Sequence, residues 1–223
     1  MNGAQVRTAR KARGLNQADV ARRLGVSQGY VSLLERNHRS VPVALAPKLA
    51  SLLDMPARLV PVRAGAALRA ADARRQLGTL GYPGFEYLES RRRLNPAEVL
   101  LRTLRADVLD ARVVSALPWL LVQYPDLKWE WVVREAKQDD LQNRLGFVVS
   151  LARALAEAQG QTHAVNTLSQ WEHRLEASRL LKTDALSSAT EAEERWLRHH
   201  RSPEARRWNV LSTLTAESVV NAS

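Results

Sequence analysis

Residues 15–35, LNQADVARRLGVSQGYVSLLE, contain two short helical patterns that are separated by a single glycine, Gly25. Two helices can be joined this closely only if a small residue lies where they cross and the turn residue accepts a positive φ angle. Ala21 and Gly25 meet these requirements, and Ser27 is a suitable N-cap for the second helix. The sequence therefore predicts a tight corner between two short helices. Its inner apolar set is Val20, Leu24, Val26, Val31 and Leu34.

Helical periodicity extends through the rest of the chain. No segment alternates apolar and polar residues with the β-branched enrichment that is typical of strands. We therefore expect an all-α protein, with four to five short helices in its N-terminal part and a larger helical domain after them. The short helices are predicted at 3–13, 17–24, 28–35 and 43–53. The later ones are predicted at 66–77, 96–107, 110–123, 128–138, 140–158, 163–182, 189–200 and 203–212.

The segment DMPARLVPVRAG, residues 54–65, has two prolines and a glycine within twelve residues, a composition that is unfavourable for regular structure. We place a domain boundary here, which divides the chain into domains at 1–65 and 66–223. Within the second domain, residues 78–87 are predicted to form a loop. Asn95 and Pro96 are predicted to cap and start the helix that follows.

Positive charge is concentrated in the first quarter of the chain. The 223 residues have a net charge of +10, and residues 1–63 contain 11 Lys and Arg against 3 Asp and Glu, a net charge of +8. A small basic domain attracts polyanions, because each phosphate that it neutralises releases a condensed counterion. The charge distribution favours a nucleic-acid partner for the first domain over a merely solvated basic surface.

The segment RGLNQADVARRLGVSQGYVSLLERNHR resembles the Xre-type (Cro/C1 repressor-like) helix-turn-helix family of transcriptional regulators, over about residues 3–56. In that family a glutamine opens each helix of the motif, and here these glutamines are Gln17 and Gln28. The resemblance implies that Gln17 anchors a phosphate and braces Gln28, which hydrogen-bonds an adenine edge in the major groove. It also implies an internal ion pair between Arg10 and Glu35. The protein would then bind a double-stranded DNA operator.

The resemblance assigns candidate residues to three roles. The candidates for base contact are Gln28, Gly29, Tyr30, Ser32 and Leu33. The candidates for contact with the DNA backbone are Asn16, Gln17, Ser27, Arg36, Asn37 and Arg39. The residues of the motif scaffold are Ala21, Gly25, Val31, Leu34, Arg10 and Glu35. For Tyr30 and Leu33, packing against the fourth helix is the alternative.

The second domain has no comparable motif. Its six tryptophans have the helical spacing of core residues, but Trp129 and Trp131 cannot face the same side of a helix. One of the two is expected to reach a neighbouring helix, a partner or a ligand. The five histidines lack metal-ligand spacing and there is no cysteine, so we expect no metal site, no cofactor and no catalytic residues.

These features together lead to a functional hypothesis. The lack of cysteine, of a secretory signal and of any apolar run near 20 residues favours a soluble, cytoplasmic protein without a membrane partner. The lack of a catalytic motif favours a non-enzymatic one. We expect a homodimeric repressor of a palindromic operator, with the autoregulating antitoxin of a toxin-antitoxin pair as its leading specific form. The second domain would then bind a protein partner, the toxin. The alternative is a regulator whose second domain senses a peptide or a small molecule.

Overall fold

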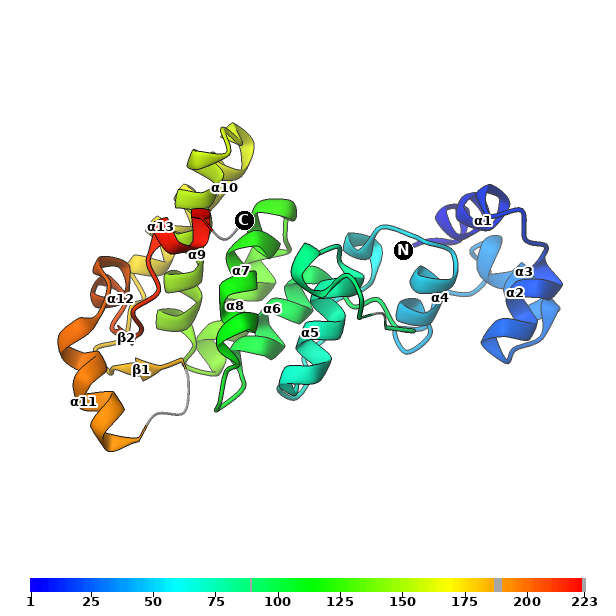
Figure 1. Ribbon diagram of the computed structural model, residues 1–223. Coiled ribbons are helices and arrows are strands. Elements are labelled where there is room, and N and C mark those ends of the chain that lie inside the picture. The colour runs from blue at the N-terminus through cyan, green and yellow to red at the C-terminus, as the bar shows by residue number, and fades with distance from the viewer. Residues whose placement is uncertain (89, 187–189, 222–223) are drawn as a thin grey trace.

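The computed structural model describes residues 1–88, 90–186 and 190–221 and shows an elongated, almost entirely helical molecule (Figure 1). The all-α prediction is confirmed. Four helices and one 3₁₀ turn lie at one end of the molecule, in the N-terminal part (residues 1–65). They are α1 (Gly3–Ala12), α2 (Gln17–Leu24), α3 (Gln28–Glu35), α4 (Ala46–Leu52) and η1 (Ala57–Leu59).

The larger part, from residue 66 onward, contains the remaining elements. Its helices are α5 (Ala70–Thr79), α6 (Pro96–Leu104), α7 (Ala111–Gln123), α8 (Trp129–Gln138), α9 (Gln142–Ala158), α10 (Thr162–Glu176), α11 (Glu191–His200), α12 (Pro203–Arg207) and α13 (Ala216–Asn221), with a 3₁₀ turn η2 (Pro83–Phe85). Two short strands, β1 (Asp184–Ala185) and β2 (Val210–Leu211), pair in parallel. Asp184 is opposite Val210, and Ala185 is opposite Leu211.

Side-chain caps determine where several helices begin. The Asn16 side chain accepts from the backbone N–H of Asp19 and the Asp19 carboxylate accepts from that of Asn16, which satisfies two free amides at the start of α2. Asn95 caps α6, and Pro96 occupies the first helical position. The predicted helix start at Asn95 and Pro96 is therefore confirmed.

Two hydrophobic clusters form the interior. The smaller one joins α1 to α4 and contains Val6, Val20, Val31, Leu49 and other buried residues up to Val60. The larger one extends from Ala57 to Val219. Helix α9 lies at its centre, since it packs against both α7 and α10. The N-terminal part thus has a core of its own.

The predicted linker at 54–65 is packed against the larger part. The Asn95 Nδ2 donates to the carbonyls of Val60 (2.7 Å) and Arg58 (3.3 Å). Further along, the Arg105 guanidinium donates to the carbonyl of Gly65 (2.9 Å). The division into domains at 1–65 and 66–223 stays a prediction, but the connection between the two parts is hydrogen-bonded along its length.

Two of the predicted helices extend furthest beyond the observed C-terminal ends. The helix predicted at 163–182 ends at Glu176, because buried Asn143 accepts from the N–H of Leu180 and donates to the carbonyls of Leu180 and Lys182, which fixes a non-helical backbone there. The helix predicted at 203–212 ends at Arg207. Asn209 adopts a positive φ of 53°, and the next two residues form β2. The prediction at 189–200 begins outside the described residues, and α11 begins at Glu191.

Candidate DNA interface

The corner between α2 and α3 is formed by Gly25. This residue has a left-handed conformation with φ of 72°, and it ends α2 while the N–H of Val26 donates to the carbonyl of Ala21 (3.0 Å). Ala21 is buried where the two helices cross. The Ser27 side chain accepts from the N–H of Tyr30 (3.1 Å) and caps α3. These contacts fix the direction of α3 relative to α2.

A buried ion pair ties α1 to the end of α3. Arg10 Nε lies 2.5 Å from Glu35 Oε1, and Arg10 Nη2 lies 3.0 Å from Glu35 Oε2. The side chain of Gln17, at the start of α2, donates to the same carboxylate (2.9 Å). Gln17 therefore contacts Glu35, whereas the family resemblance implied that it would brace Gln28.

The pKa of Glu35 reflects this environment. Burial alone would raise it, but the hydrogen bonds from Arg10 and Gln17 and the positive charge of Arg10 lower it below the ordinary glutamate value. The Arg10 pKa is correspondingly raised, mainly by its hydrogen bond to Glu35. Both groups are therefore charged at neutral pH, and they hold three helices in one arrangement.

The turn after α3 is fastened to the start of α1. Asn37 has a positive φ of 58°, and its Oδ1 accepts from the N–H of Gly3 (2.7 Å). A Cβ atom at Gly3 would lie 2.0 Å from the carbonyl oxygen of Leu34, so α1 can approach this turn only with glycine at that position. Asn37 thus has a structural contact in addition to its predicted DNA contact.

The candidate base-contact residues all lie on one helix, α3, and three of them are exposed on its outer surface. Gln28, Gly29 and Leu33 are exposed, with Leu33 39% accessible, while Tyr30 and Ser32 are half-buried. On the opposite side of α3, Val31 and Leu34 are buried in the core. A Cβ at Gly29 would meet no atom within 4 Å, so this position leaves open space beside Gln28. The arrangement presents an uncovered helix surface on a fixed support.

Comparison with known families supports a nucleic-acid role for this arrangement. Residues 6–60 match the family model described as Helix-turn-helix. The N-terminal part is a Cro/C1-type helix-turn-helix domain. A search of curated proteins and a search of solved structures each gave no match. The match of this domain supports a DNA-binding transcriptional regulator.

The candidate backbone contacts lie at the two ends of α3, the candidate reading helix, and at the start of α2. Arg36 and Arg39 are exposed in the turn after α3, and the Arg39 guanidinium lies 5.7 Å from the centre of the Tyr30 ring. Asn16 and Ser27 are the N-caps of α2 and α3. Helix N-termini attract phosphates, because their first N–H groups have no intrahelical partner. Contact of these residues with DNA stays a prediction.

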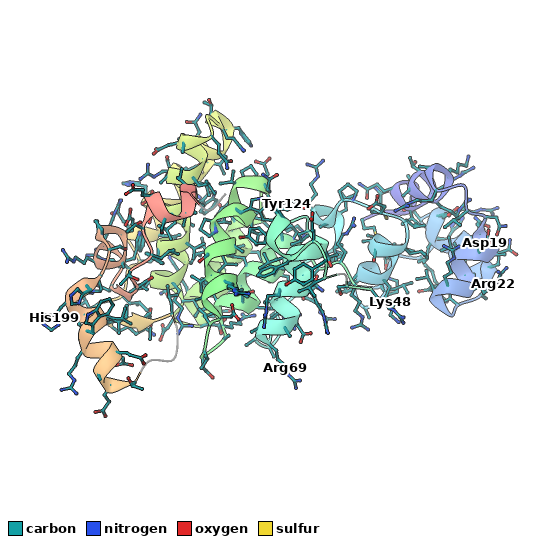
Figure 2. The ribbon with its side chains drawn as sticks, viewed as in Figure 1. Asp19, Arg22, Lys48, Arg69, Tyr124 and His199 are labelled. Carbon is teal, nitrogen blue, oxygen red and sulfur yellow. The ribbon has the colours of Figure 1, made fainter. Side chains whose placement is uncertain are left out.

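Two cations that were not among the predicted site residues lie close to α3. Lys48 of α4 and Arg92 of the larger part line an open groove of about 530 Å³ together with Ser27 and Tyr30. Figure 2 shows Asp19 and Arg22 at the outer end of the molecule and Lys48 nearer the larger part. The run of three arginines at 91–93 marks a basic segment in the sequence, but it does not indicate that the segment lies near α3.

All six tryptophans lie in the larger part. Trp129 stacks on Trp171 of α10, with ring centres 5.5 Å apart, so it is the member of the 129 and 131 pair that reaches a neighbouring helix. Trp131 is half-buried against the same core. Within the described ranges no three His, Asp or Glu side chains converge as a metal site. None of the described helices combines the length and apolar content that crossing a bilayer requires.

Proposed function

We propose that the protein is a sequence-specific repressor that binds a palindromic operator as a homodimer. The observation that supports this best is the uncovered outer surface of α3, held in place by the buried contacts of Glu35 with Arg10 and Gln17. A helix supported in this way enters the major groove with its N-terminal residues against the base edges. Repression follows if the operator overlaps the promoter of the regulated gene.

Gln28 is the principal candidate for base recognition. Its exposed side-chain amide lies at the first position of α3, and a glutamine amide can form two hydrogen bonds with an adenine edge. Gly29 would allow close approach of the helix to the bases, and Leu33 offers an apolar contact for a thymine methyl group. Tyr30 and Ser32, which are half-buried, would contact the walls of the groove.

Replacement of Gln28 by alanine is expected to weaken operator binding by roughly 1–3 kcal/mol and to change binding to random DNA much less. The reason is that the variant removes a base contact and leaves the phosphate contacts in place. Fluorescence anisotropy with the protein's own upstream region and with random duplexes measures both affinities. Arg36→Ala is the matched comparison, since loss of a phosphate contact lowers both affinities alike. Equal losses for Gln28→Ala on the two DNAs would refute its role as a reader.

The larger part is proposed to form the dimer. In a symmetric dimer, two reading helices about 34 Å apart contact successive major grooves on one face of the duplex, which explains a palindromic operator. A chain truncated after residue 65 keeps the small hydrophobic cluster of α1 to α4 but loses the contacts of Asn95 with Val60 and Arg58.

This fragment is expected to fold, as circular dichroism would show, and to bind the operator at least tenfold more weakly and without cooperativity, because only one half-site is held by each molecule. Light scattering of the full chain gives the oligomeric state directly. A fragment that binds as tightly and as cooperatively as the full chain would contradict a dimerising role for the larger part.

Two more specific forms of this function differ in the ligand of the larger part. An antitoxin would bind a protein, and the exposed Trp196 of α11, 54% accessible, is suited to such an interface. An effector sensor would bind a peptide or small molecule, and a mainly apolar groove of about 420 Å³ between α7, α11 and the C-terminal segment favours that alternative.

Co-expression with the neighbouring gene product separates the antitoxin from the effector sensor. A toxic neighbour that co-purifies supports the antitoxin, whereas a non-toxic neighbour and ligand-dependent release from DNA support the sensor.

A further inference from the structure

The segment at residues 90–93 is fastened to the helix-turn-helix domain although it belongs to the larger part. Arg93 Nη1 donates to the Asp54 carboxylate (3.0 Å) and to the carbonyl of Met55 (3.0 Å). The backbone N–H of Arg93 donates to the carbonyl of Pro47 in α4 (3.2 Å). In Figure 1 this loop runs from the region of α5 to α4. The segment therefore contacts the first turn of α4 and the two residues, Asp54 and Met55, that lie just after its C-terminal end.

The backbone of Arg92 is held from the other side by α5. The Gln76 side chain, which is buried, donates to the carbonyl of Arg92 (2.9 Å) and to Ser90 Oγ (3.0 Å). Ser90 Oγ in turn accepts from the N–H of Arg92 (3.2 Å). An arginine on a backbone fixed in this way loses less conformational freedom when it binds than one on a mobile loop.

The neighbouring arginines differ in what their side chains contact. The Arg93 guanidinium is bonded to Asp54 and to the carbonyl of Met55. Arg91, Arg92 and Lys48 are exposed, and among the described residues their side chains form no ion pair or hydrogen bond. Arg92 and Lys48 line the groove that begins at the N-terminus of α3 with Ser27 and Tyr30. Arg92 and Lys48 are therefore uncompensated cations beside the proposed reading helix, and Arg91 is the exposed residue that precedes Arg92.

We propose that Arg91 and Arg92, together with Lys48, bind DNA phosphates that flank the site read by α3. The larger part would then contribute directly to the DNA interface, beyond the matched residues 6–60. This inference rests on the proposed function. Phosphate is the ligand class because the three side chains are donors only, and arginine forms paired hydrogen bonds with phosphate oxygens. Such contacts add affinity and fix orientation without reading sequence.

The test uses the full chain with Arg91 and Arg92 both replaced by alanine. Its affinity for the upstream region is measured by anisotropy at several salt concentrations and compared with the wild type. The expected result is about tenfold or greater loss at roughly 0.1 M salt, on operator and random DNA alike, and a log–log salt dependence less steep by about 1.8. A second variant with lysine at both positions is expected to retain most of the salt dependence.

The matched control replaces Arg112 and Arg206 by alanine. Both are exposed, form no side-chain bond among the described residues, and belong to the larger part away from this groove. The control removes the same charge, so an equal loss in it would overturn the inference by showing a general charge effect. Unchanged affinity and salt dependence in the Arg91 and Arg92 variant would also overturn the inference. If the wild type still bound the operator in that case, the proposed function would stand. Absence of wild-type DNA binding would instead remove the proposed function itself.

Discussion

A chain with alanine in place of Glu35 should lose about 3 kcal/mol of stability in the N-terminal part and, with it, operator binding. Removal of one member of a buried ion pair leaves the other charge without compensation, which costs about 3–5 kcal/mol. The Arg10 side chain is 11% accessible and Glu35 2%. We expect the lower value, because Arg10 Nη1 keeps its bond to the carbonyl of Leu15 (2.7 Å).

Urea denaturation followed by circular dichroism measures this loss. Arg22→Ala serves as the control: this side chain is 79% accessible, and its contact with Asp19 is 3.5 Å long, so stability should change very little. A Glu35 variant as stable as the control would contradict the structural role of the pair. The lowered pKa of Glu35 adds a pH effect, since its stabilisation is present above the ordinary glutamate pKa and is lost as pH falls through the lowered folded value.

Replacement of Trp208 by alanine should have a comparable effect on the larger part. Trp208 is fully buried, and its ring lies against α9 where a Cβ at Gly146 would come within 2.2 Å of it. Loss of a buried tryptophan costs about 3–5 kcal/mol. Trp208 Nε1 has no hydrogen-bond partner among the described residues, which reduces the net contribution of the side chain. We therefore expect a loss of about 3 kcal/mol.

Tryptophan fluorescence reports this change selectively, because all six tryptophans belong to the larger part. The fluorescence transition should move to lower urea, whereas Trp196→Ala, at an exposed position, should move it little. If the Trp208 variant also destabilised α1 to α4 by the full amount, the two predicted domains would not fold independently. A Trp208 variant that unfolds at the wild-type urea concentration would contradict the packing described here.

The local signals were sufficient for the two helices of the helix-turn-helix motif. Gly25 and the caps at Asn16 and Ser27 act within a few residues of their own position, so the sequence alone predicted α2 and α3 at their observed bounds. The candidate reading surface follows from the same helical periodicity. The second contact of Gln17, with Glu35, was not predicted, because it depends on how α1 and α3 pack.

Contacts between distant residues explain most of the rest. The end of α10 depends on Asn143, more than thirty residues earlier, whose side chain binds the backbone at Leu180 and Lys182. A helical pattern at 177–182 carries no trace of that partner. The position of Arg92 beside α3 likewise depends on Gln76 and Arg93, and charge counting along the chain could not place it there.

The hydrogen-bonded connection at residues 58–65 has a geometric consequence for the proposed dimer. Because Asn95 and Arg105 hold this stretch, we expect it to act as a stiffer spacer than a glycine-rich tether of the same length. Rigid spacers set the distance between two reading heads and their rotation about the duplex at once. The protein would then act as a molecular ruler that distinguishes operators by the number of base pairs between half-sites as well as by their bases.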